Sequence, residues 1–208
     1  MAGLRSRPAV CLLENNLKPK ILAVLAVMAT TAAAPAAYAQ TAEQRLPACL
    51  ACHGTNGTAK LPGVPSLGAM PADYVLTQLY MFREKMRIAA PMNALAEPLS
   101  DDDLRDLGEA ISKLPPPQAA GEAMAMADAE HGNALVNRYH CNSCHGADLA
   151  GHDNIPRIAG QREDYLLKSL TDYKSGARPG YSPAMSEASK EIQPDDIPVL
   201  ARFVSRYK

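Results

Sequence analysis

Two stretches of this chain, Cys49-Leu50-Ala51-Cys52-His53 and Cys141-Asn142-Ser143-Cys144-His145, share the pattern Cys-x-x-Cys-His. Residues three apart lie on neighbouring faces of one helical turn, so both thiols and the following imidazole can reach one bound group. The pattern is typical of haem c attachment, in which the thiols bind the haem vinyl groups and the imidazole binds iron. We therefore predict two covalent haem c groups, attached through Cys49, Cys52, Cys141 and Cys144 and ligated by His53 and His145.

Two other kinds of site use the same residues. Four Cys and His ligands can close a tetrahedron around zinc, and a Cys-x-x-Cys pair can act as a redox dithiol. Haem is favoured because the His follows the second Cys directly in both copies. A zinc site would also leave the methionines described next unexplained.

Methionine is the expected sixth iron ligand in both halves of the chain. Met92 follows His53, and Met185 follows His145 at nearly the same separation along the sequence. A thioether favours ferrous iron, and an iron with six ligands has no open position for a substrate. Met86 is an alternative to Met92 as the ligand of the first haem.

The remaining methionines and histidines are expected to have other roles. Met81 falls within a helical pattern beside Leu79 and is expected to pack in the core. Met124 and Met126 are expected to pack or to face solvent. We expect the other histidines to lie at the surface or beside a ligand, and these are His131, His140 and His152.

A proline follows each haem-motif histidine at a similar separation, Pro65 after His53 and Pro156 after His145. A turn at each proline can offer a backbone carbonyl to the imidazole Nδ1, which would orient the ring and raise its basicity. Tyr74 and Tyr165 also recur, and the pattern leaves open whether they reach a haem propionate or pack in the core.

The chain contains an internal duplication with a period of about 91 to 93 residues. Val64-Pro65-Ser66-Leu67 corresponds to Ile155-Pro156-Arg157-Ile158, and the segment from Ser100 to Leu104 corresponds to that from Gln193 to Ile197. A proline-rich segment that cannot continue a helix separates the repeats. We predict two domains, residues 40–114 and 128–208, joined by a stiff linker over residues 115–127.

Both repeats show helical periodicity, which predicts an all-α protein. Apolar residues recur at helical spacing behind the acidic residues after Ser100 and again behind Pro194. Further helices are expected at Ala72 to Lys85 and at Glu163 to Ser175, and a helix from Ala129 to Tyr139 is expected to run into the second haem motif. Because each half is too short for a large core, we expect haem to supply apolar mass.

The segment 1–39 resembles an export signal. An apolar run from Ile21 to Ala34 follows a basic segment and precedes the small-x-small site Ala37-Tyr38-Ala39. We expect cleavage after Ala39 and export to the periplasm. A retained membrane anchor is the alternative, although the run is shorter than the ~18 to 20 residues of a membrane span. Cys11 falls in this leader, so we expect no disulfide in the mature protein.

The formal net charge is −1, and removal of the basic leader makes the chain more acidic. This balance gives no support for nucleic-acid binding.

The tandem motifs resemble the dihaem c-type cytochromes of the cytochrome c4 family. The likeness spans residues 40–208 and is strongest from Cys141 through Ile155-Pro156-Arg157-Ile158-Ala159-Gly160-Gln161 and Gly176-Ala177-Arg178 to Met185. The first half departs from it, because residues 83–90 lack the Gly-Ala-Arg pattern. The resemblance implies two class I cytochrome c domains, and it implies His53 with Met92 and His145 with Met185 as axial ligand pairs.

Three functions are compatible with these features. The favoured one is a periplasmic electron carrier that passes electrons from a respiratory donor, such as a cytochrome bc1 complex, to a terminal oxidase; association with the periplasmic face of the membrane is left open. The second is the cytochrome subunit of an exported dehydrogenase that oxidises a sulfur compound or an alcohol. The third is a dihaem peroxidase-type enzyme, which needs one iron with an open position.

Overall fold

The computed structural model describes residues 41–119, 121–181 and 183–207. They belong to one compact unit, Ala39–Lys208. The predicted leader, with its cleavage site and Cys11, lies outside the described residues. Among the residues that are described, no helix is long and apolar enough to span a membrane.

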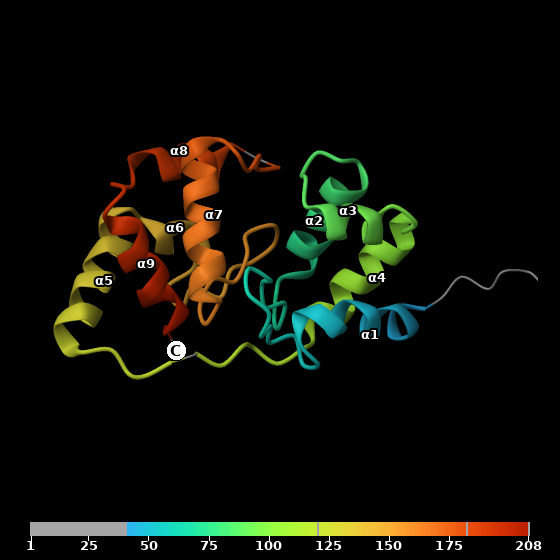
Figure 1. Ribbon diagram of the computed structural model, residues 1–208, viewed down its shortest axis with the longest axis horizontal. Coiled ribbons are helices and arrows are strands. Elements are labelled where there is room, and N and C mark those ends of the chain that lie inside the picture. The colour runs from blue at the N-terminus through green and yellow to red at the C-terminus, as the bar shows by residue number, and fades with distance from the viewer. Residues whose placement is uncertain (1–40, 120, 182, 208) are drawn as a thin grey trace, which may run out of the picture. The chain divides into compact units, whose positions relative to one another are not determined.

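The described part of the chain is helical, and its only strand-like feature is an isolated bridge between His152 and Ile155. The predicted all-α class is therefore confirmed (Figure 1). The first half contains α1 (Ala42–His53), α2 (Ala72–Arg83), α3 (Ala90–Ala96) and α4 (Asp101–Ser112). The second contains α5 (Met126–Arg138), α6 (Cys141–His145), α7 (Glu163–Ser175), α8 (Ala184–Glu191) and α9 (Asp196–Ser205).

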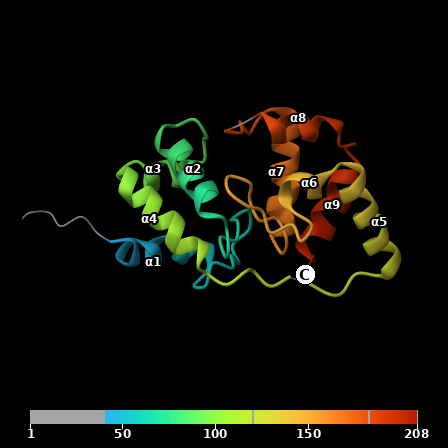
Figure 2. The same cartoon turned by 180° about the vertical axis from the view of Figure 1, so that it is seen from behind.

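The duplication seen in the sequence recurs in the order of the helices, since α2, α3 and α4 correspond to α7, α8 and α9. Each half has its own apolar core: Leu79, Leu104 and Leu107 lie in the first, and Leu135, Leu200 and Phe203 lie in the second. In the described residues, helices pack only against helices of the same half, for example α2 on α4 and α5 on α9 (Figures 1 and 2). The halves meet instead through loops and side chains.

The acidic segment after Ser100 starts α4 as predicted. The Asp103 backbone N–H donates to Ser100 Oγ at 3.1 Å, and the Ser100 N–H donates to Asp103 Oδ2 at 2.9 Å. These bonds satisfy backbone donors that the first helical turn leaves without partners. The helix then buries Leu104, Leu107 and Ile111 on one face.

The prediction of one helix running into the second haem motif was wrong. Helix α5 starts earlier than expected, at Met126, and ends at Arg138, and a separate short helix α6 carries the motif. The break falls at His140, whose φ of 53° is incompatible with a continuing right-handed helix. In the first half α1 is continuous through its motif. The middle helix α2 is shorter than predicted and ends at Arg83, just before Lys85 turns to a φ of 57°.

Candidate haem sites

The first candidate iron ligand, His53, is the last residue of α1 and is buried. Its Nδ1 lies 2.7 Å from the carbonyl oxygen of Pro65, which can only accept a hydrogen bond. Nδ1 therefore carries the proton, and Nε2 keeps its lone pair for a metal. Burial lowers the pKa of His53, although the Pro65 bond opposes this, so the imidazole is neutral as metal binding requires.

His145 ends α6 and has the same arrangement. Its Nδ1 donates to the Pro156 carbonyl oxygen at 2.8 Å, and burial again lowers the pKa of the imidazole. The prediction that each proline offers a carbonyl to its histidine is thus confirmed in both halves. The two carbonyls fix the ring orientation and increase the electron density on the ring.

Within the described residues, none of the four motif cysteines forms a disulfide. Burial raises the pKa of Cys49 and of Cys141. A structural zinc site needs four converging donors. Within residues 41–119, 121–181 and 183–207, no three His, Cys, Asp or Glu side chains converge as a metal site. The donor set therefore fits thioether attachment and a single iron–imidazole bond better than zinc.

The methionines differ in how far their side chains are buried. Met81 is fully buried in α2, as predicted for a core residue, whereas Met86 is 49% exposed. Met92 lies on α3 and packs partly buried against the first core. Met185 lies at the start of α8 and is also half-buried. Partial burial suits a side chain that would bury its sulfur against a haem, and it favours Met92 over Met86.

Asn93, the neighbour of Met92, was not identified from the sequence. Its Nδ2 donates to the carbonyl oxygens of Phe82 at 2.7 Å and Arg87 at 2.8 Å. Its Oδ1 accepts from the Ala89 N–H at 2.7 Å. These bonds tie the start of α3 to the end of α2 and so fix the backbone that carries Met92. The sequence signal is weak, since Asn in a first helical turn usually indicates only a cap.

A buried arginine joins the two halves. Arg178 is 7% exposed, and its guanidinium donates to the Tyr74 hydroxyl at 3.1 Å and to the Tyr165 hydroxyl at 3.3 Å. Burial alone would raise the pKa of Tyr165, but the charges of Arg178 and Arg87 outweigh it and bring that pKa to about 8. Burial, together with the charge of Tyr165, raises the pKa of Tyr74 to about 12. Both tyrosines therefore belong to a buried polar cluster, in which their hydroxyl oxygens accept hydrogen bonds from Arg178.

Two arginines, the buried Arg178 and the half-buried Arg157, test whether the chain fits a haem. Arg178 Nε and Arg157 Nε are buried and have no hydrogen-bond partner. Among the described residues, the guanidinium of Arg178 donates its hydrogen bonds to hydroxyl oxygens alone. A buried cation that lacks an anionic partner is costly, because it loses its hydration without full compensation. The carboxylates of a haem would supply the missing anionic acceptors, so the chain fits this cofactor.

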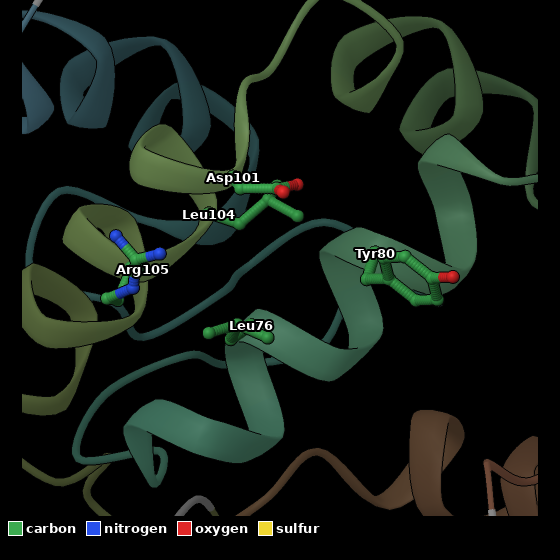
Figure 3. Close-up of a pocket in the computed structure, with 5 residues that line it drawn as sticks. All are labelled: Leu76, Tyr80, Asp101, Leu104 and Arg105. Carbon is green, nitrogen blue, oxygen red and sulfur yellow. The ribbon is translucent and has the colours of Figure 1, made fainter.

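A surface pocket between α2 and α4 is unrelated to these residues (Figure 3). Its volume is about 240 Å³, and it is lined by Leu76, Tyr80, Asp101, Leu104 and Arg105. This is below the ~300 to 1,000 Å³ of typical ligand pockets. Its acidic group already pairs with Arg83.

The remaining histidines and methionines lie as expected. His131, His140 and His152 are exposed. Met126 is exposed, and Met124 packs against the second core.

Comparison with known proteins agrees with this geometry. The Cytochrome c family model matches residues 129–206. Cytochrome c4 of Pseudomonas aeruginosa is 28% identical over 151 residues, which cover 69% of this chain and 75% of that protein. The crystal structure of reduced cytochrome c4 from Pseudomonas stutzeri matches with a TM-score of 0.72 and 26% identity, over 82% of this chain and 100% of the other. The chain is thus similar to cytochrome c4 proteins over about two thirds of its length.

Cytochrome c4 proteins are two-domain class I cytochromes with two haems, so the predicted fold class and the two covalent haem c groups are confirmed. The function shown by these relationships is electron transfer by a dihaem cytochrome. A further relative, a thiosulfate dehydrogenase electron acceptor of Stutzerimonas stutzeri, is 26% identical and covers 68% of this chain and 69% of that protein. The domain boundaries and the individual ligands predicted above stay predictions.

Proposed function

We propose that this cytochrome c4 relative is an exported electron carrier in which His53 and Met92 ligate the first haem and His145 and Met185 ligate the second. The observation that carries the proposal is the paired histidine geometry. In both halves a buried, neutral imidazole donates from Nδ1 to a proline carbonyl and leaves Nε2 for iron. Both halves also place a half-buried methionine at the matching point of the repeat.

When bound, each haem iron exchanges one electron between Fe(III) and Fe(II). The chain contributes by holding its ligands in place while the charge changes. Each histidine is fixed by the covalent motif beside it and by a carbonyl bond of at most 2.8 Å. Asn93 fixes the backbone next to Met92 with three hydrogen bonds. Ligands that move little between oxidation states suit a carrier, and six-coordinate iron leaves no place for a substrate.

We place the protein in the periplasm, where haem c proteins with a cleaved leader act, with the leader removed after Ala39. In this setting it would accept electrons from a respiratory donor such as a cytochrome bc1 complex and deliver them to a terminal oxidase, with contact to the membrane face through these complexes. The acidic balance of the chain allows steering toward a basic partner surface.

A second candidate follows from one of the relatives. A thiosulfate dehydrogenase electron acceptor aligns over most of this chain. The protein would then accept electrons from an exported dehydrogenase that oxidises a sulfur compound or an alcohol. The same haem ligation serves both roles, so the donor separates them.

The first test is a spectroelectrochemical titration of the holoprotein, with haem counted per chain and carbon monoxide added to the reduced form. Two high-potential haems that bind no carbon monoxide are expected from two His and Met ligand pairs. One low-potential haem, or one that binds carbon monoxide, would contradict the proposed ligation and favour a peroxidase-type enzyme.

The donor is tested by kinetics with the same holoprotein. Reduction by quinol through a bc1 complex is compared with reduction by thiosulfate through a thiosulfate dehydrogenase, with a mitochondrial cytochrome c as the control acceptor. Fast reduction by the bc1 complex alone supports the respiratory carrier, and fast reduction by the dehydrogenase alone supports the second candidate.

A further inference from the structure

A single buried glutamine connects the second half to the loop that orients His53. Gln161 and Ser66 are 4% and 1% exposed. They form a reciprocal pair of hydrogen bonds: the Ser66 N–H donates to Gln161 Oε1 at 2.8 Å, and Gln161 Nε2 donates to the Ser66 carbonyl oxygen at 2.9 Å. Both groups are shielded from water, so neither bond can be replaced by solvent at low cost.

The peptide bond at this contact has two ends with different partners. The carbonyl of Pro65 and the N–H of Ser66 belong to the same peptide unit, which is planar and conjugated. Its oxygen accepts from His53 Nδ1 at 2.7 Å, and its N–H donates to Gln161 Oε1. Hydrogen bonds at the two ends of one amide strengthen each other. Gln161 therefore makes the Pro65 carbonyl a stronger acceptor for the His53 proton.

Neighbouring residues of the second half hold the same loop. Asp164 Oδ2 accepts from the Gly63 N–H at 2.9 Å, and Arg162 Nη1 donates to the Ala59 carbonyl oxygen at 3.3 Å. The segment 161–164 thus contacts both ends of the loop 59–66, with Gln161 at the peptide next to the histidine.

Within the described residues, His145 has no equivalent contact. The corresponding peptide joins Pro156 to Arg157, and in the described part of the chain no side chain accepts a hydrogen bond from the Arg157 N–H. The residue that corresponds to Gln161 in the first repeat is Met70, which lies buried in the first core. The arrangement is therefore one-sided: the second half acts on the first histidine.

We propose that Gln161 is a positioning residue for His53, through which the second half tunes the first haem by way of the Pro65–Ser66 peptide. The inference rests on the proposed role of His53 as an iron ligand. A stronger Nδ1 bond makes the imidazole a better electron donor, which stabilises Fe(III) and lowers the potential. Loss of the glutamine amide should raise the potential of the first haem and leave that of the second unchanged.

The test compares three variants of the full holoprotein. Gln161→Leu removes both bonds to Ser66, and Gln161→Glu keeps the side-chain length and an acceptor for the Ser66 N–H. Gln193→Leu is the matched control, because Gln193 lies in the same half and is exposed. The readouts are the two potentials and, by NMR of the oxidised protein, the paramagnetically shifted Nδ1–H signals of the two axial histidines, assigned by selective labelling.

In Gln161→Leu we expect the His53 Nδ1–H signal to shift and to exchange faster with solvent, and the first potential to rise. The His145 signal and the second potential should stay at their wild-type values. In Gln161→Glu the neutral acid reproduces both bonds, so the His53 signal returns toward wild type at low pH and the first potential falls as the carboxyl ionises. Gln193→Leu should match the wild type.

Unmoved His53 signals in Gln161→Leu, or equal changes at both histidines, would overturn the inference. If the leucine variant does not fold, Gln161→Glu decides alone, and a first potential with the same pH dependence as the wild type overturns it. A wild-type protein without any shifted His53 Nδ1–H signal would instead contradict the proposed ligation itself, so the two failures are distinguishable.

Discussion

Replacement of Gly132 by alanine should destabilise the second half through a single added methyl group. Gly132 lies in α5, where the helix contacts α9. A Cβ at this position would lie 2.4 Å from Phe203 Cγ and 2.5 Å from Phe203 Cβ and Cδ2. Ordinary carbon contacts are about 3.5 to 4.0 Å, so the ring would have to move by roughly 1 Å. Phe203 is buried in the second core, and its ring lies edge to face against the Tyr207 ring with the two ring centroids 5.6 Å apart. This packing blocks the movement of the Phe203 ring.

Two opposing effects set the size of this change. Overpacking of a filled core costs about 1 to 3 kcal/mol, and three overlapping heavy atoms place this site at the upper end. Alanine favours a helix over glycine by about 1 kcal/mol, which offsets part of the cost. The expected net loss of unfolding free energy is about 2 kcal/mol.

Guanidinium unfolding of the oxidised holoprotein, followed by far-ultraviolet circular dichroism, measures this loss. The control is Asn133→Ala, which changes an exposed neighbour on the same helix and should stabilise the protein slightly through propensity alone. In a Phe203→Ala background the same Gly132→Ala change should cost less, because two of the three overlapping atoms, Cγ and Cδ2, are then absent. The packing argument is refuted if Gly132→Ala is as stable as Asn133→Ala.

Three further predictions concern the ligands, a helix cap and pH. Met185→Ala should lower the second haem's potential and let the reduced protein bind carbon monoxide, as optical titration would show. Ser100→Ala should lower the unfolding free energy by about 1 kcal/mol, because the Asp103 N–H loses its acceptor. One tyrosine, Tyr165, should ionise with a pKa of about 8, seen by ultraviolet difference absorption. Between a pH of about 8 and the usual tyrosine pKa of ~10, the unfolded chain binds more protons than the folded chain, so the free energy of unfolding should rise with pH. The contribution of Tyr165 to stability is lost as pH falls through about 8.

Each of these has a control and a contrary outcome. Met126→Ala changes an exposed methionine and should leave both potentials alone; an unchanged titration in Met185→Ala would remove Met185 from the iron. Ser112→Ala, at the other end of α4, should cost less than Ser100→Ala, and equal losses would argue against the cap. Tyr165→Phe should abolish the ionisation near pH 8, and its persistence would assign that proton to another group.

Local sequence patterns predicted much of the helical structure. The boundaries of α7 were predicted to the residue, and α4 starts directly after Ser100, where the acidic cap lies. These features depend on neighbours three or four residues apart, so the sequence contains their whole cause. The break at His140 was missed, because a positive φ at a non-glycine residue is set by packing around the motif. The start and end of α5 were also not predicted to the residue.

The sequence by itself determined the chemistry of the attachment sites. Cysteine spacing, the adjacent histidine, the repeated proline and the repeated methionine are covalent facts of the chain, and they predict two haems and two orienting carbonyls. The tertiary structure alone decided which residues form hydrogen bonds between the two halves. Gln161 meets Ser66 across 95 residues, and Arg178 meets Tyr74 across 104 residues. No local periodicity encodes such contacts, because both partners must first be buried together before an amide or a guanidinium gains from the bond.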